Sequence, residues 1–184
     1  MGKISNRSVF RDSALSSGLV TQEQLDRAIA AIRSGSQTLA TPLEDVSDAE
    51  LAAKLVETRV LTPYQADQLK AGRTKLCLGP YTITEWIGQG GMGQVFKAVH
   101  KMLGRECAIK VLPLHKSTPE AIESFMREMR TQAQLDHANL VRAYDAGHDG
   151  NVHYLVTEYV PGTDLRQLVR RQGALTMQLS LIHI

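Results

Sequence analysis

The sequence predicts an α+β protein in which an all-helical N-terminal region precedes an antiparallel sheet. Helix-capping signals recur along residues 1–75 at a fixed spacing, which predicts helices there. Five strand-like runs joined by tight turns follow over residues 81–160, interrupted by one amphipathic helix at 118–135. We therefore expect a five-stranded antiparallel sheet with one helix packed on it, followed by helices at 164–172 and 174–184.

Composition and charge narrow the class of protein. The 184 residues allow one or two domains, and 21 Lys and Arg nearly balance 19 Asp and Glu. This balance gives no strong field for nucleic acid or membrane surfaces, and no apolar run approaches the roughly 18 residues of a membrane span. The two cysteines, Cys77 and Cys107, fit no metal motif, and Cys107 should be buried. We expect a cytoplasmic protein without nucleic-acid partners, membrane segment or metal ligands of its own.

The helical region contains a weak internal repeat. Residues 17–25 match residues 58–66 at an offset of 41 positions. Each copy holds a threonine N-cap and, three positions on, a glutamine that completes a capping box: Thr21 with Gln24, and Thr62 with Gln65. Ser47 and Glu50 form a third box, Pro63 suits a first helical position, and Gly72 is a natural helix end.

Each copy thus predicts a helix, a short apolar turn and a second helix. Two copies give a four-helix unit of about 65 residues, near the lower limit for independent stability. Two interpretations stay open: an extension that supports the following fold, or a module that binds a protein partner through residues 1–75. We expect connectors at 34–46 and 72–80, which divides the chain into regions 1–75 and 80–184.

A glycine-rich loop organises the second region. Gly88, Gly90 and Gly93 have the spacing GxGxxG, which two kinds of phosphate-binding loop share. A dinucleotide-binding loop runs from a strand directly into a helix. Residues 94–100 contain β-formers and no N-cap, and residues 83–87 also read as a strand, which favours a strand–loop–strand hairpin. Such glycines let backbone N–H groups approach an anion, although a hairpin without ligand is the alternative.

A lysine and a glutamate follow the loop. Lys110 lies in the otherwise apolar strand 105–112, where a charge is costly unless it is paired. In the next helix, capped by Ser117 or Thr118, one face carries residues at steps of four and three: Ala121, Phe125, Glu128, Gln132 and Leu135. Glu128 in the middle of that face needs a partner. The alternative is an exposed glutamate beside Arg127 and Arg130.

The order of these motifs resembles the N-terminal lobe of a bacterial serine/threonine protein kinase of the eukaryotic-like type. The glycine loop with Val95 is followed by Cys107-Ala108-Ile109-Lys110, where Cys107 replaces the valine of the family motif. The resemblance implies ATP as phosphate donor and protein Ser or Thr hydroxyls as acceptors. It also implies that Lys110 holds the α- and β-phosphates and that Glu128 holds Lys110, so these two are the candidate catalytic residues.

The segment after the helix resembles the rest of the nucleotide cleft. Residues 141–145 and 152–156 read as a hairpin across Gly147–Gly150, and residues 157–162 resemble the hinge between kinase lobes. Thr157 takes the gatekeeper place, and Asp164 is either a ribose contact or the N-cap of its helix. The nucleotide-binding residues implied are Ile87, Gly88, Gln89, Gly90, Gly91, Gly93, Val95, Ala108, Lys110, Val141, Thr157, Glu158, Val160 and Asp164.

The resemblance covers about residues 80–180. The His-Arg-Asp and Asp-Phe-Gly motifs of the family do not occur in the 184 residues. We therefore expect a kinase truncated before its catalytic loop, with the protein ligands of Mg²⁺ beyond residue 184 and no phosphotransferase activity by itself. Two other functions stay open: a pseudokinase or nucleotide-binding scaffold, and a protein-interaction module through residues 1–75.

Overall fold

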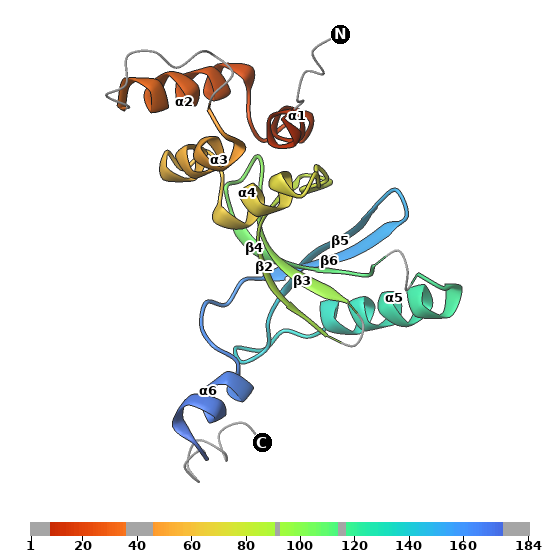
Figure 1. Cartoon of the computed structure of the whole chain (residues 1–184). Helices are drawn as coiled ribbons and strands as arrows, with labels where there is room; N and C mark the ends of the chain where they lie inside the picture. Colours follow the sequence, from red (N-terminus) through yellow and green to blue (C-terminus); the bar gives the residue numbers. More distant parts are fainter. Residues whose placement is uncertain (1–7, 36–45, 91–92, 114–116, 175–184) are drawn as a thin grey trace.

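The chain folds into a helical end and a sheet end (Figure 1). The computed structural model describes residues 8–35, 46–90, 93–113 and 117–174. The helices are α1 (Val9–Ser16), α2 (Gln22–Gly35), α3 (Asp48–Glu57), α4 (Pro63–Lys70), α5 (Pro119–Ala133) and α6 (Leu165–Gln172). The strands are β1 (Cys77–Leu78), β2 (Tyr81–Gln89), β3 (Gln94–His100), β4 (Glu106–Val111), β5 (Ala143–Asp149) and β6 (Val152–Glu158). The expected helix 174–184 falls almost wholly outside the described residues.

The strands form one antiparallel sheet in the order β1-β2-β3-β4-β6-β5. The prediction of an α+β fold is confirmed, and the five strands expected over residues 81–160 are present as β2 to β6. The described residues add a sixth strand before them. The additional strand, β1, lies in the connector 72–80, where Cys77 pairs with Thr82 and Leu78 with Tyr81. Gly79, with φ +51°, reverses the chain between the two strands.

The predicted position of the turn between β5 and β6, at Gly147–Gly150, is wrong. Strand β5 continues through Asp149, and the chain turns at Gly150 and Asn151, with Gly150 at φ +59°. A two-residue turn with positive φ matches the twist of the flanking strands, so it is preferred over a longer loop. Gly147 lies inside β5, where a Cβ would come within 2.7 Å of the Tyr154 hydroxyl. The absence of a side chain at Gly147 therefore leaves room for the ring of Tyr154 on the neighbouring strand.

The four N-terminal helices share one buried core, and the predicted capping signals lie at their starts. The capping boxes of Ser47–Glu50, Thr62–Gln65 and Thr21–Gln24 are all present. The turn residues Gly18 and Arg59, 41 positions apart, both have left-handed φ angles, +69° and +59°. Buried side chains from all four helices form the core, together with Val20 and Leu61 from the turns and with Leu76: Phe10, Ala14, Leu25, Ala28, Leu51, Ala52, Leu55, Ala66 and Leu69.

The sheet has a different core on each face. On one face Tyr81, Ile83, Cys107, Ile109 and Tyr154 are buried together with neighbouring strand residues. On the other face α5 packs against the sheet through Leu112, Phe125, Met129 and Leu155. Figure 1 shows helices α1–α4 gathered at one end of the sheet and α6 beyond the other end. Within the described ranges, no helix is long and apolar enough to span a bilayer.

The two free thiols differ in access, which gives a first prediction. Cys107 is 1% exposed, and burial raises its pKa to about 11, whereas Cys77 is half-buried. Thiolates are the reactive form, so we expect iodoacetamide at pH 8 to modify Cys77 in the folded chain and Cys107 only after unfolding. Mass spectrometry of the Cys77→Ser variant checks this. Rapid alkylation of its remaining thiol under native conditions would contradict it.

Candidate functional site

The glycine-rich segment is a hairpin between two paired strands. Gly88 pairs with Val95 and Gln89 with Gln94, and the Gly90 N–H donates to the Gly93 carbonyl at 2.8 Å. Strand β3 begins directly after Gly93, so no helix starts there and the dinucleotide-loop alternative is wrong. Gly91, expected to contact phosphate, lies outside the described residues.

The three described glycines of the loop are glycines for different reasons. A Cβ on Gly93 would lie 2.2 Å from the Val111 carbonyl oxygen, so the neighbouring strand excludes any side chain there. Among the described residues, no heavy atom lies within 4 Å of a Cβ added to Gly88 or Gly90, and neither glycine has a positive φ. Neither packing nor backbone conformation requires glycine at these two positions. A bare backbone there leaves room for a molecule to approach closely.

Lys110 and Glu128 form a salt bridge between β4 and α5. The Lys110 Nζ lies 2.5 Å from the Glu128 Oε1, with the side chains 24% and 36% exposed. The other carboxylate oxygen, Oε2, is buried and accepts no hydrogen bond from the part of the chain that the structure describes. The alternative of a glutamate beside Arg127 does not hold, because Arg127 pairs with Glu123 at 3.2 Å. The pairing predicted from the sequence is present, and its catalytic role stays a prediction.

The buried face of α5 differs from the predicted one. It is centred on Phe125 and Met129, while Leu135 lies beyond the helix end and is exposed. Glu128 therefore lies at the edge of the buried face rather than in its middle, which explains why the salt bridge is half-open to solvent. Gln132, further along, donates a long hydrogen bond of 3.4 Å to the Val141 carbonyl.

Strand register brings several predicted residues onto one face. Residues directly opposite each other in a ladder share a face of the sheet. Val95 pairs with Lys110, and Ala108 pairs with Thr157. Since Lys110 points to α5, its strand neighbour Ala108, two positions away, lies on that face too. The structure thus collects Val95, Ala108, Lys110 and Thr157 on the α5 face, with Gly88 opposite Val95 at its border.

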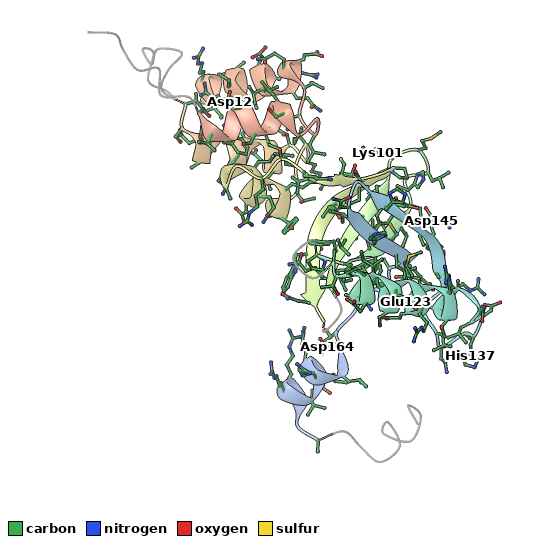
Figure 2. The ribbon with its side chains drawn as sticks, turned by 90° about the vertical axis from the view of Figure 1, so that its right-hand side faces the viewer. Asp12, Lys101, Glu123, His137, Asp145 and Asp164 are labelled. Atoms are coloured by element: carbon green, nitrogen blue, oxygen red, sulfur yellow. The ribbon has the colours of Figure 1, made fainter. Side chains whose placement is uncertain are left out.

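The remaining residues predicted to bind nucleotide lie at strand ends, beside α5 or at the start of α6. Ile87 and Gln89 are at the end of β2, and Glu158 ends β6, with its N–H on the Arg142 carbonyl. Val141 lines a cavity of about 520 Å³ along α5 that also includes Glu128. Val160 is 61% exposed. Figure 2 shows Asp164 at the start of α6. Its carboxylate accepts from the Gln167 N–H at 2.7 Å, which supports the N-cap interpretation.

The sequence analysis missed a second ion pair on the α5 face. Lys97 lies 2.7 Å from Glu106 and 4.5 Å from the centroid of the Tyr159 ring. The hydrogen bond that the Lys97 ammonium donates to Glu106 is the main cause of a raised Lys97 pKa. Lys97 is two positions from Val95, so strand alternation places both on one face, and this signal was available from the sequence. The partner Glu106 follows only from the β3–β4 register.

Comparisons with known proteins agree with this geometry. The family model described as "Protein kinase domain" matches residues 81–181. A probable serine/threonine-protein kinase of Clostridium acetobutylicum is 44% identical over 95 residues, which are 50% of this chain and 14% of that protein. The kinase PknA of Mycobacterium tuberculosis is 40% identical over 109 residues, with coverage of 56% and 25%. The kinase PrkC of Bacillus subtilis is 40% identical over 98 residues, with coverage of 53% and 15%.

The matched region begins at the first residue of β2 and includes the hairpin, the salt bridge and the segment leading to α6. The chain spans a quarter or less of the length of these curated relatives. The family model nevertheless covers more than half of the chain. The chain therefore belongs to the protein kinase family and is related to the serine/threonine kinases of bacteria.

Proposed function

We propose that residues 80–184 bind ATP and form the nucleotide-binding part of a serine/threonine protein kinase. The observation that carries this proposal is the Lys110–Glu128 salt bridge on the same face as the glycine hairpin. An ammonium group held by a carboxylate is a fixed positive charge, and the open backbone at Gly88 and Gly90 leaves space for phosphate beside it. We also propose that residues 1–75 form a separate helical region before the nucleotide-binding part.

The reaction of the family is transfer of the ATP γ-phosphoryl group to a Ser or Thr hydroxyl of a protein substrate. Its catalysis depends mainly on positioning and on stabilisation of charge. Lys110 would hold the α- and β-phosphates, Glu128 would keep its ammonium in place, and Val95 and Ala108 would contact the adenine. In the family, Mg²⁺ neutralises charge on the phosphates. No group of three His, Cys, Asp or Glu side chains arranged to bind a metal occurs in residues 8–35, 46–90, 93–113 and 117–174. We therefore assign no step of the reaction to Mg²⁺.

A nucleotide-binding protein without transfer is the second candidate. The His-Arg-Asp and Asp-Phe-Gly motifs are absent from residues 1–184, and in the family these supply the base and the metal ligands. The proposal therefore predicts that the 184-residue chain binds ATP without transferring phosphate.

A cytoplasmic location is part of the same proposal, because Cys77 and Cys107 are both free thiols.

Two glycine variants test the nucleotide site. The added methyl groups of Gly88→Ala and Gly90→Ala meet no atom of residues 8–35, 46–90, 93–113 or 117–174 within 4 Å, so we expect thermal unfolding to be unchanged. Each methyl group would intrude where phosphate approaches the backbone, which should weaken ATP binding on the order of tenfold through lost charge-assisted hydrogen bonds. Titration with a fluorescent ATP analogue measures the affinity, and unlabelled ATP must displace it. Equal affinity in the wild type and both variants would show that the hairpin does not bind phosphate.

A further inference from the structure

Helix α4 contacts the free edge of strand β2. Strand β1 covers that edge only at Tyr81 and Thr82. Immediately beyond, the Gln65 side-chain Nε2 donates to the Ile83 carbonyl at 2.7 Å, and the Thr62 hydroxyl donates to the Thr84 carbonyl at 2.6 Å. Two successive carbonyls of the strand are thus held by two side chains of the helical region. Figure 1 shows α4 as the helix of that region nearest to the sheet.

These carbonyls lie at an irregularity of the β2–β3 ladder. The register passes from Ile83 opposite Ala98 to Glu85 opposite Lys97, so Thr84 is an extra residue in β2. A bulge of this kind leaves backbone groups without ladder partners and changes the direction and twist of its strand. Backbone groups removed from water need a replacement partner. Thr62 and Gln65 supply those partners, and the Leu76 carbonyl accepts the Ile83 N–H at 2.9 Å.

Both side chains do this while capping their own helix. The Gln65 Oε1 accepts the Thr62 N–H at 2.9 Å, and the Thr62 hydroxyl accepts the Gln65 N–H at 3.1 Å. Gln65 is only 4% exposed, which is unusual for a glutamine. Between them, Tyr64 packs against the cores of both regions, and its ring centroid lies 6.4 Å from that of Phe96. The contact is therefore fixed by hydrogen bonds at the bulge and by an aromatic pair beside it.

We propose that Thr62 and Gln65, here called the β2 clamp, are positioning residues for the glycine hairpin. The clamp holds the bulge at Thr84, and the strand runs from there to Gly88, about 13 Å further on at the usual rise per residue. Because a bulge sets the direction of the strand that follows, the clamp directs β2 toward a second irregularity, between Trp86 and Gly88, where the hairpin begins. The inference rests on the proposed function, since it assigns the helical region a role in nucleotide binding. It favours the interpretation of residues 1–75 as a supporting extension.

The internal repeat supplies a matched control. In the first copy, the Gln24 Oε1 accepts the Thr21 N–H at 2.9 Å, and the Thr21 hydroxyl accepts the Gln24 N–H at 3.2 Å. This capping box is solvent-exposed, and Glu23 takes the place that Tyr64 has in the second copy. A substitution in the first copy therefore changes the same cap without changing the hydrogen bonds to β2.

The test compares Gln65→Glu with Gln24→Glu in the full chain. A glutamate keeps the oxygen that accepts the cap N–H but lacks the Nε2 donor to the Ile83 carbonyl. Hydrogen exchange of amides in residues 83–99 reports the hairpin, and a fluorescent ATP analogue reports affinity. We expect Gln65→Glu to raise exchange there about tenfold and to weaken nucleotide binding, because one buried hydrogen bond is lost. Gln24→Glu should leave both unchanged.

A threonine pair repeats the test if buried charge in Gln65→Glu prevents folding. Thr62→Val removes the hydroxyl that binds the Thr84 carbonyl, Thr62→Ser retains it, and Thr21→Val is the first-copy control. We expect faster exchange in Thr62→Val and wild-type behaviour in Thr62→Ser. Wild-type exchange at residues 83–99 in a folded Thr62→Val chain overturns the clamp. A wild-type chain that binds no nucleotide overturns the proposed function instead, and the exchange rates then decide the clamp by themselves.

Discussion

Replacing Lys110 with Met is expected to weaken ATP binding by the 184-residue chain. Lys110 lies on the α5 face opposite Val95 of the hairpin, and Glu128 holds its ammonium at 2.5 Å. A charge-assisted contact to phosphate contributes about 1.5–3 kcal/mol, so we expect an affinity loss on the order of tenfold or more. Calorimetric titration with ATP measures it for the chain.

Glu128→Gln separates the two roles of the pair. The amide keeps the size of the carboxylate but removes its charge, so Lys110 keeps its phosphate contact and loses its anchor. Because both side chains are partly exposed, the effect on stability should be about 1 kcal/mol rather than the 3–5 kcal/mol of a fully buried pair. We expect nucleotide affinity between that of the wild type and Lys110→Met. Lys110→Met with wild-type affinity would show that this lysine does not bind the phosphates.

Gly93→Ala is expected to destabilise the fold. Its Cβ would lie 2.2 Å from the Val111 carbonyl oxygen and 3.1 Å from the Val111 carbonyl carbon, which are backbone atoms and cannot rotate away. The β3–β4 ladder starts beside it, with Gln94 opposite Val111, so the backbone of one strand must move. Overpacking of this kind typically costs about 1–3 kcal/mol. Denaturation in urea, followed by circular dichroism, measures the change in unfolding free energy.

Gly90→Ala is the matched control for this effect. It adds the same methyl group three residues earlier, where nothing lies within 4 Å. The two variants should therefore behave in opposite ways: Gly93→Ala loses stability, and Gly90→Ala loses nucleotide affinity alone. Equal unfolding free energies for the two variants would mean that β3 and β4 do not approach each other as closely as in the structure.

Features that depend on near neighbours in the chain could be predicted well. The capping boxes of Thr21, Ser47 and Thr62 join residues three positions apart, so spacing and residue type define them. The hairpin at Gly88–Gly93 was predicted for a similar reason, since the β-formers after it exclude a helix start. Lys110 and Glu128 are 18 positions apart. Their pairing was predictable because Lys110 is a charge in an otherwise apolar strand and the order of the kinase motifs indicated Glu128 as its partner.

Features that depend on how whole faces meet were predicted poorly. Strand β1 was missed because two residues carry no periodic pattern and pair only where the Gly79 turn brings them beside β2. The predicted buried face of α5 included Leu135, whereas the structure buries Phe125 and Met129. Helical periodicity alone does not show which of two neighbouring rows of apolar side chains packs against the sheet. The ion pair of Lys97 with Glu106 depends on the register of two strands.

The sequence by itself determined the kinase motifs, the order of helices and strands, and the caps that begin the helices, because each depends on a few residues at short spacing. The tertiary structure decided which of two equivalent capping boxes meets the sheet. Thr21 and Thr62 look alike in the sequence, yet only Thr62 lies beside the bulge at Thr84. The physical reason is that a backbone carbonyl accepts a hydrogen bond from whichever donor packing brings within about 3 Å, and packing is a property of the complete fold.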